Sequence, residues 1–285
     1  MQPVLSHYQV KPLLQHRSQN LNNPAEVTLS FDLGLTQTQA SLSADGLHFA
    51  DFAPVSWNDL TLITGEENAV FELFDDGAVQ KVSTFSEELQ RSYSLFPTLS
   101  APTMLVSGIT MHRIVNCDPH QDTLNKIKAF GGPPLGKVLD TTMGLGYTAI
   151  QAARTASSVL TIEIDPAVVE ICQLNPWSKG LFEKENIERR IGHSWDVIEE
   201  FPDNSFSIIT HDPPMFNMAG ELYSLEFYKE LYRVLSHKGR LFHYIGNPKS
   251  KSGATVTRGV IRRLQEAGFT RVSSREQAFG VLATK

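Results

Sequence analysis

Apolar and polar residues alternate differently in the two parts of this chain. Up to about residue 100, short runs alternate with a period of two, which is typical of strands that bury one face. Turn sequences at 44–46 and 75–77, each containing Asp-Gly, separate several of these runs. A short helix is expected at 86–95, with Ser86 as its N-cap. The pattern predicts a small antiparallel β unit with strands at 27–33, 39–42, 47–49, 69–74 and 79–85.

From residue 118 onward, segments with the period of a helix alternate with short apolar runs. The predicted helices are 118–130, 147–155, 166–174, 194–201, 225–235 and 257–267. The predicted strands are 137–140, 159–164, 190–191, 206–210 and 239–244, with a closing edge hairpin at 270–274 and 279–283. Such alternation implies a doubly wound, mostly parallel sheet. We therefore expect an α/β fold made of a small N-terminal antiparallel β domain (1–100), a connector (101–117) and a Rossmann-like domain (118–285).

Composition and charge narrow the class of protein only broadly. The chain has 285 residues, of which 41% are hydrophobic and 20% charged, as in ordinary globular proteins. It contains no apolar run near the roughly 18 residues that span a bilayer and no secretory signal at its start, so a cytoplasmic protein without a membrane anchor is expected. Its two cysteines, Cys117 and Cys172, are too few for a disulfide framework or a metal cluster, and no metal is expected. A net charge of −6 argues against nonspecific coating of nucleic acid but leaves room for a local basic groove.

The first candidate site is the loop that follows strand 137–140. This loop reads Asp140-Thr-Thr-Met-Gly-Leu-Gly146, and its two glycines let a ligand approach the backbone closely. An acid before the loop would repel a pyrophosphate and suits a cationic amine. Glu163 ends the next strand, 23 positions later (163 − 140), where a carboxylate can accept both hydroxyls of a ribose. Asp165 is expected to cap the following helix. This order of features predicts a site for a ligand that carries adenosine.

The second candidate site is the sequence His211-Asp-Pro-Pro-Met-Phe216, which ends strand 206–210 at the carboxyl edge where ligands bind in such sheets. This motif resembles the (Asp/Asn)-Pro-Pro-aromatic motif of methyltransferases that act on planar amines. The resemblance implies that the side chain of Asp212 and the carbonyl of Pro213 accept the two N–H bonds of a conjugated amine. The lone pair of the amine then turns toward the group to be transferred, and positioning supplies most of the rate. The prolines make the loop rigid and remove competing N–H donors.

The order and spacing of these motifs resemble a class I S-adenosylmethionine-dependent methyltransferase over about residues 105–285. The stretch 101–246 resembles a subgroup of predicted methyltransferases of bacteria and archaea. Members that methylate planar amines carry (Asp/Asn)-Pro-Pro-aromatic, whereas here Met215 stands at the aromatic position and Phe216 follows it. His193 stands where many members place an acid for the adenine amine. The resemblance implies S-adenosylmethionine as cofactor and the following cofactor-binding residues: Asp140, Thr142, Gly144, Gly146, Glu163, His193, Ser194 and Asp212.

The resemblance also implies an N-methyltransferase that acts on an amine. Asp212, Pro213 and Phe216 are the expected catalytic residues. RNA is the leading substrate class, because an additional N-terminal domain and a basic cluster at 247–263 accompany the Asp-Pro-Pro motif. A homodimer is left open. The expected substrate contacts are His112, Arg113, Pro214, Met215, Glu221 and Tyr223.

Two other functions fit the sequence. The chain also resembles polyamine aminopropyltransferases, which use decarboxylated S-adenosylmethionine, since a small β domain precedes such a core and Glu163-Ile-Asp165 follows its second strand. An acidic net charge suits a polycationic substrate, but those enzymes do not carry the Asp-Pro-Pro-Met-Phe loop in this form. A non-catalytic protein that binds S-adenosylmethionine, as a partner or regulator, is kept open by His193 and Met215.

Overall fold

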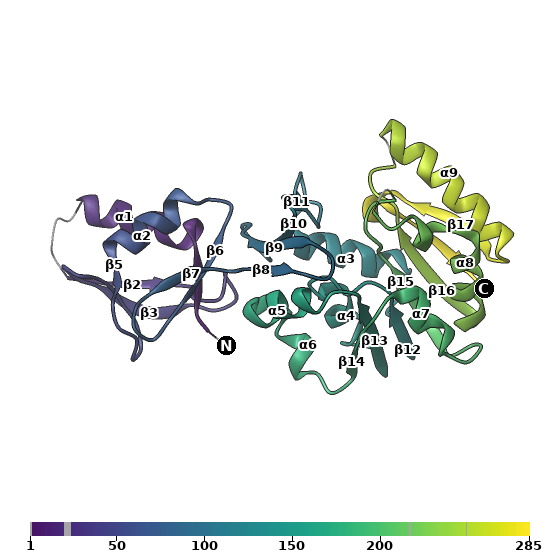
Figure 1. Cartoon of the computed structure of the whole chain (residues 1–285), viewed down its shortest axis with the longest axis horizontal. Helices are drawn as coiled ribbons and strands as arrows, with labels where there is room; N and C mark the ends of the chain where they lie inside the picture. The colour runs from purple at the N-terminus through teal and green to yellow at the C-terminus, as the bar shows by residue number, and fades with distance from the viewer. Residues whose placement is uncertain (1, 20–23, 217, 249) are drawn as a thin grey trace. The chain divides into compact units, whose positions relative to one another are not determined.

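The computed structural model describes residues 2–19, 24–216, 218–248 and 250–285 (Figure 1). Its internal contacts divide the chain into two compact units. The first unit comprises Met1–His120 with Ala167–Lys179, and the second comprises Gln121–Pro166 with Gly180–Lys285. This division assigns residues 167–179 to the first unit, whereas the predicted domain limits place them in the Rossmann-like domain. The domain limits at 100 and 117 stay a prediction.

In the part of the chain that the structure describes, the first unit contains three small antiparallel sheets, with strand orders β1-β6-β7, β2-β3-β4-β5 and β11-β10-β9-β8. The helices α1 (His7–Gln19) and α2 (Trp57–Gly65) share one apolar core with strands of the first two sheets, built around side chains such as Leu47, Leu60 and Phe71. The strand bounds are β1 (Val4–Ser6), β2 (Ala25–Leu29), β3 (Thr38–Leu42), β4 (Gly46–His48), β5 (Val55–Ser56), β6 (Val70–Leu73), β7 (Val79–Lys81), β8 (Ser83–Ser86), β9 (Arg91–Phe96), β10 (Thr103–Val106) and β11 (Ile109–Thr110).

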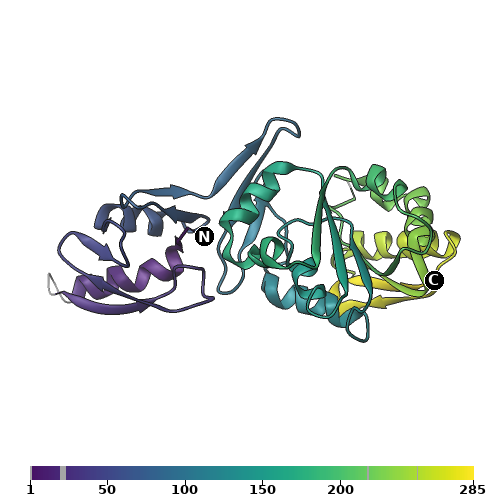
Figure 2. The same ribbon diagram turned by 90° about the horizontal axis from the view of Figure 1, so that it is seen from below.

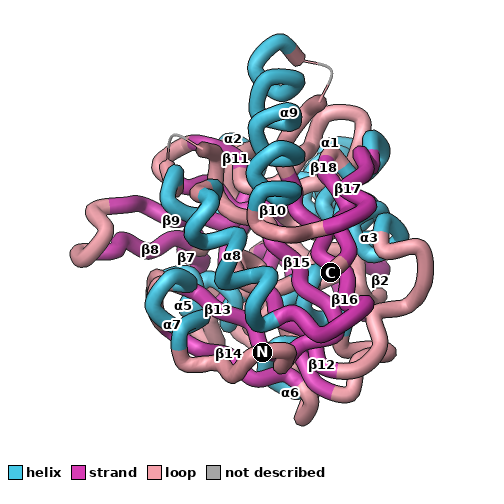
Figure 3. The backbone as a smooth tube through the Cα atoms, turned by 90° about the vertical axis from the view of Figure 1, so that its right-hand side faces the viewer, coloured by secondary structure: helices cyan, strands magenta, loops and turns pink. Residues whose placement is uncertain are grey.

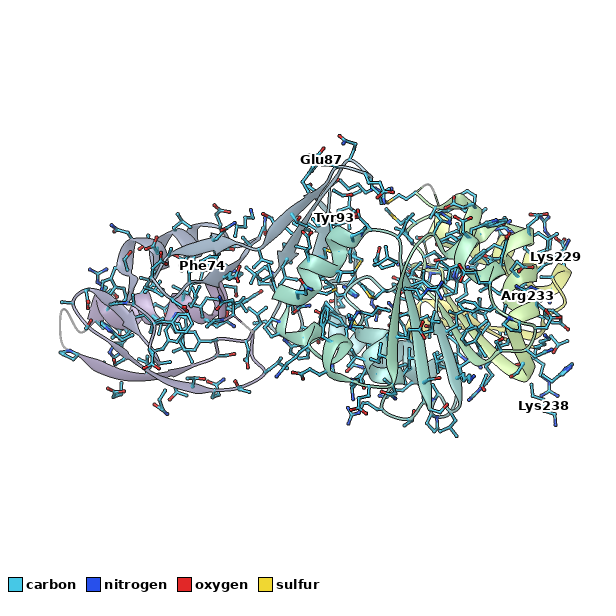
Figure 4. All side chains as sticks on the ribbon, turned by 60° about the horizontal axis from the view of Figure 1, so that its bottom comes forward. Phe74, Glu87, Tyr93, Lys229, Arg233 and Lys238 are labelled. Atoms are coloured by element: carbon cyan, nitrogen blue, oxygen red, sulfur yellow. The ribbon has the colours of Figure 1, made fainter. Side chains whose placement is uncertain are left out.

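The predicted helix at 86–95 was wrong, because this segment forms a β-hairpin. The Ser86 hydroxyl accepts a hydrogen bond from the Leu89 amide at 3.2 Å, as an N-cap would, but the bond closes the turn between β8 and β9. Tyr93 and Leu95 are buried two residues apart, which is strand spacing. Figure 2 shows this long hairpin, and Figure 4 labels Glu87 at its tip. The expected connector also contains a hairpin, formed by β10 and β11.

Two helices of the first unit, α1 and α2, were not predicted from the sequence. In α2 the buried residues Trp57, Leu60 and Ile63 follow one another at intervals of three, and the Ser56 hydroxyl accepts a hydrogen bond from the Asp59 amide at 3.1 Å. This cap followed by a three-residue spacing is a helix signal that short period-two runs on either side obscured. The first unit is therefore a mixed α and β structure.

The second unit is built on one large sheet with strand order β14-β13-β12-β15-β16-β18-β17. Strands β12 to β16 pair in parallel, and β18 runs antiparallel to both of its neighbours. This confirms the predicted doubly wound, mostly parallel sheet. The strand bounds are β12 (Lys137–Asp140), β13 (Ser158–Glu163), β14 (Ile187–Ile191), β15 (Phe206–His211), β16 (Leu235–Tyr244), β17 (Thr270–Arg275) and β18 (Gly280–Thr284).

Helices cover the sheet of the second unit. Phe227, Leu231 and Val260 of α8 and α9 pack on the sheet in one apolar cluster together with α7, and Figure 3 shows α8 and α9 lying over the strands. The described residues contain no helix with the length and apolar composition needed to cross a membrane. The remaining helices of the chain are α3 (Pro119–Ala129), α4 (Tyr147–Ala152), α5 (Pro166–Leu174), α6 (Gly180–Glu183), α7 (Ser194–Glu199), α8 (Leu225–Val234) and α9 (Lys251–Glu266), with 3-10 turns η1 (Pro176–Ser178), η2 (Gly220–Tyr223) and η3 (Glu276–Ala278). Of these, η1 and nearly all of α5 belong to the first unit.

Candidate functional site

Asp140 ends β12 with its carboxylate buried inside the sheet. Its Oδ2 accepts a hydrogen bond from the Thr161 hydroxyl at 2.7 Å, and its Oδ1 accepts one from the Thr210 hydroxyl at 2.8 Å. Burial raises the pKa of the Asp140 carboxyl to about 7. Asp140 therefore joins β12 to its neighbours β13 and β15 at the point where the glycine loop, residues 141–146, leaves the sheet. A direct contact with a cofactor stays a prediction for this residue.

The glycine loop needs its glycines for backbone reasons. Gly146 has φ of 74° at the start of α4, and a Cβ there would collide with the side chain of Leu181. Gly144 has φ of 52°, and its amide donates a hydrogen bond to Glu163 Oε2 at 3.0 Å. The hydroxyl oxygen of Thr142 is buried, and among the described residues it has no hydrogen-bond partner. A buried hydroxyl of this kind fits a loop that closes around a polar ligand.

We expect Gly146→Ala to destabilise the second unit by about 1–3 kcal/mol, because alanine disfavours this φ and its methyl group would displace Leu181. Chemical denaturation measures the loss. Leu181→Ala and the double variant complete a cycle, in which the double variant should lose less than the sum of the two single variants. Strictly additive losses would contradict the predicted collision.

Glu163 ends β13 and links that strand to the glycine loop. Besides the Gly144 bond, its Oε1 accepts a hydrogen bond from the Asp165 amide at 3.1 Å, and burial raises the pKa of its carboxyl to about 7. The backbone of Ile164 donates a third hydrogen bond to this carboxylate, and since a carboxylate offers about four acceptor positions, about one remains for a ligand. Ile164 and Ile191, which were not predicted as site residues, lie beside Glu163 and are 41% and 50% exposed. An exposed apolar side chain directly after β13 and another at the last position of β14 are the signal that marks them, and the two offer a surface for a flat apolar group.

The structure brings His193 and Glu221 together, although they come from different motifs. His193 Nδ1 accepts a hydrogen bond from the Trp195 amide at 3.2 Å and so caps α7. Nε2 therefore carries the hydrogen in the neutral ring, and it lies 3.5 Å from Glu221 Oε1. The neighbouring Ser194 hydroxyl donates a hydrogen bond to the carbonyl of Thr141 in the glycine loop. His193 thus fixes the start of α7. The carboxylate of Glu221 lies beside it, near the position where the resemblance to methyltransferases predicts an acid.

Asp212 is paired with a lysine that sequence analysis missed. Its Oδ2 lies 2.6 Å from Lys126 Nζ, and Lys126 also lies 3.0 Å from Asp122 Oδ2 on the same helix, α3. The side chains of Lys126 and Asp212 are 5% and 24% exposed. Burial alone lowers the pKa of Lys126, but the two carboxylates outweigh it and hold that pKa above its ordinary value. For Asp212, burial raises the pKa and Lys126 opposes that rise. The signal in the sequence was an Asp122–Lys126 pair at i,i+4 on a helix that covers the sheet.

The rest of the Asp-Pro-Pro loop, residues 212–216, is held from η2. The Tyr223 hydroxyl donates a hydrogen bond to the carbonyl of Pro214 at 3.1 Å, and the rings of Tyr223 and Phe216 lie 5.5 Å apart. Tyr223 is buried, whereas Met215 and Phe216 are each 53% exposed. Tyr223 and Pro214 therefore shape the loop, and Met215 and Phe216 present an apolar surface beside Asp212. Direct substrate contacts of these residues, and the catalytic role of Pro213, stay predictions.

The other predicted substrate residues, His112 and Arg113, belong to the first unit. His112 Nδ1 lies 3.0 Å from the Thr103 hydroxyl, and the Arg113 guanidinium donates a hydrogen bond to Cys117 Sγ at 2.9 Å. Their contact with a substrate stays a prediction. Among the residues that the structure describes, no group of three or more His, Cys, Asp or Glu side chains is arranged to hold a metal ion.

Comparison with known proteins gives one close relative and two informative structures. The chain is 43% identical over 264 residues to the uncharacterized protein MJ1233 of Methanocaldococcus jannaschii, a match that covers 91% of this chain and 90% of that protein. Spermidine synthase in complex with the transition state analogue AdoDATO superposes with a TM-score of 0.58 at 19% identity, covering 75% of this chain and 79% of that one. Spermidine synthase from Thermotoga maritima gives 0.55 at 19% identity, covering 75% and 77%. At this identity the likeness shows the fold. No family model matches the sequence.

Proposed function

This chain belongs to the family of the uncharacterized protein MJ1233 of Methanocaldococcus jannaschii, and we propose that it is an S-adenosylmethionine-dependent N-methyltransferase that acts on a neutral amine. The observation that carries the proposal is the Lys126–Asp212 ion pair at the carboxyl edge of the sheet. It lies at the end of β15, next to the strand from which the glycine loop leaves. A residue that can position an amine thus stands beside a loop that can hold a cofactor.

The ion pair favours a neutral substrate over a cationic one. Lys126 occupies Asp212 Oδ2, while among the described residues Oδ1 has no donor and remains an acceptor. A protonated amine at Oδ1 would lie near the Lys126 ammonium, and like charges at such distances repel each other. A conjugated amine is uncharged and brings an N–H bond that Oδ1 can accept. We propose an exocyclic amine of an RNA base as this substrate, since the exposed Met215 and Phe216 offer a surface on which a base can stack.

The residues around the glycine loop fit S-adenosylmethionine. Glu163 keeps about one acceptor position for a ribose hydroxyl, Thr142 offers a buried hydroxyl, and Ile164 and Ile191 can flank the adenine. When bound there, the cofactor supplies a methyl group on a positively charged sulfur. Asp212 then has one task, to hold the amine so that its lone pair faces that methyl group.

A second candidate function is aminopropyl transfer from decarboxylated S-adenosylmethionine. The likeness to two spermidine synthases over three quarters of the chain favours it. A polyamine, however, reaches the site as a cation, and Lys126 already neutralises one charge of the acidic pair Asp122 and Asp212. A non-catalytic role predicts cofactor binding without turnover.

Two measurements separate these functions. Calorimetry compares the affinities for S-adenosylmethionine and its decarboxylated form, and labelled methyl groups from S-adenosylmethionine are then followed into the RNA, DNA, protein and small-molecule fractions of a cell extract. We expect a preference for S-adenosylmethionine and label in RNA. A preference for the decarboxylated cofactor, with aminopropyl transfer to polyamines, would favour the second function. Binding with no label in any fraction would favour the non-catalytic role, and label confined to small molecules would exclude RNA.

The affinity for S-adenosylmethionine is expected to rise with pH because of Glu163. A ribose donates hydrogen bonds to the ionised carboxyl, and with a pKa of about 7 that form makes up about one tenth at pH 6 and about nine tenths at pH 8. The dissociation constant should fall roughly tenfold over this range, as calorimetry can measure. Glu163→Gln should bind more weakly and lose the pH dependence. If the variant kept that dependence, Asp140, with the same raised pKa, would be its source.

A further inference from the structure

The side chain of His211 lies between the two parts of the candidate site. It is fully buried at the end of β15, one residue before Asp212. Its Nδ1 is 2.7 Å from the hydroxyl oxygen of Thr141, the first residue of the glycine loop, and its Nε2 is 2.9 Å from the carbonyl oxygen of Leu222 in η2. One imidazole ring therefore contacts both the loop expected to hold the cofactor and the turn that supports the Asp-Pro-Pro loop.

The partners of His211 fix the hydrogen on its ring. The Leu222 carbonyl can only accept, so Nε2 must carry the hydrogen and donate it. Nδ1 is then an acceptor, and the Thr141 hydroxyl donates to it. Burial lowers the pKa of His211 to about 4, so the ring stays neutral and this arrangement persists at physiological pH. The ring is thus a fixed bridge with one acceptor and one donor, each satisfied by a different segment.

Both segments that His211 joins are held by further contacts with the site. The carbonyl of Thr141 accepts a hydrogen bond from the Ser194 hydroxyl, next to His193 at the start of α7. The η2 turn carries Glu221, which pairs with His193, and Tyr223, which holds the Pro214 carbonyl. A shift of the glycine loop would therefore reach the Asp-Pro-Pro loop through His211 and η2.

We propose that His211 is a positioning residue that couples the glycine loop to η2, so that occupation of the cofactor site orders the loop that carries Asp212. The cofactor half of this inference rests on the proposed function, whereas the coupling of the two segments does not. His211 touches neither reacting group and acts through Thr141 and Leu222. Ordering of the amine site would then follow occupation of the cofactor site.

Two substitutions separate the two contacts of the ring. In His211→Asn the amide group reaches about the position of Nδ1, so the Thr141 contact is kept and the Leu222 contact is lost. In His211→Gln the amide reaches about the position of Nε2, so the reverse holds. Amide hydrogen exchange, measured by mass spectrometry over 141–146 and 219–224, reports on each segment, and calorimetry with S-adenosylmethionine reports on the cofactor site.

We expect selective effects in these two variants. Without cofactor, exchange should rise about tenfold at 219–224 in His211→Asn and about tenfold at 141–146 in His211→Gln, as loss of one buried hydrogen bond allows. The dissociation constant for S-adenosylmethionine should rise about tenfold in His211→Gln and change little in His211→Asn. In the unaltered protein S-adenosylmethionine should slow exchange in both segments. In both variants it should slow exchange at 141–146 and leave exchange at 219–224 unchanged.

His243→Asn is the matched control. Its ring lies 4.4 Å from that of His211 in the same core, and its Nε2 contacts the Tyr228 hydroxyl. It meets η2 only by ring packing on Tyr223, with the ring centroids 5.2 Å apart, and the described residues show no hydrogen bond from its ring to either segment. This variant should melt at a lower temperature and keep the unaltered pattern of exchange. Equal effects of both His211 variants on both segments, or the same pattern in His243→Asn, would overturn the proposal. If the unaltered protein did not bind S-adenosylmethionine, the proposed function would fail, while exchange without cofactor would still decide the coupling.

Discussion

Replacing Asp212 by Asn is expected to lower methyl transfer at least about 100-fold, while the affinity for S-adenosylmethionine changes little. The Lys126 ammonium can only donate, so the oxygen of the new amide turns toward it. The amide NH2 group then faces the substrate, where a donor meets the N–H bond of the amine. The variant keeps the shape of the loop and loses the acceptor that orients the amine. Transfer of labelled methyl groups into RNA, with calorimetry in parallel, measures both effects.

Asp122→Asn is the control for this prediction. Asp122 is the other carboxylate that contacts Lys126, and it lies on α3 outside the Asp-Pro-Pro loop. Like Asp212→Asn, this variant removes one negative charge from the group formed by Asp122, Lys126 and Asp212. It leaves the acceptor oxygen of Asp212 in place, so it should retain most of the transfer rate. An equal loss of activity in both variants would mean that the charge of the network matters and that Asp212 does not orient the amine. Normal transfer by Asp212→Asn would exclude the proposed mechanism.

Replacing Lys126 by Met is expected to destabilise the protein by about 3–5 kcal/mol, because removal of one member of a buried ion pair leaves the other charge uncompensated. Here Asp122 and Asp212 would both lose their cation. For a chain of this size the melting temperature should fall by roughly 10 °C. The pKa of Asp212, already raised by burial, should rise further in the variant, so this carboxyl binds its proton more tightly in the folded state. Stability is then lost as the pH rises, and the destabilisation should be larger at pH 8 than at pH 5. Denaturation at both pH values measures it.

Two further variants test the cause of this loss. Lys126→Arg keeps the positive charge and should lose much less stability than Lys126→Met. The double variant Lys126→Met with Asp122→Leu removes the buried charge on α3 together with its partner, and it should recover part of the stability of the single variant. A loss in Lys126→Met that is the same at pH 5 and pH 8 would contradict the electrostatic explanation.

The fold of the second unit followed from the sequence because its signals are local. The strands β12 and β13 each end at an acidic residue, Asp140 and Glu163, and the glycine loop follows β12 directly. In the first unit the local signals were weaker. Ser86 looked like a helix cap, yet pairing with β9 made it part of a hairpin turn. Strand pairing depends on residues elsewhere in the chain, so tertiary contacts overrode the local preference.

By itself the sequence determined which motifs stand at the carboxyl edge of the sheet, namely the glycine loop, Glu163 and the Asp-Pro-Pro loop, because parallel strands alternating with helices bring their ends to one edge. Only the tertiary structure decided what these motifs contact. Lys126 lies 86 positions from Asp212, and Thr141 lies 70 positions from His211. No periodicity or spacing records such pairs, since they arise when helices and loops pack on a finished sheet and buried polar groups find partners there.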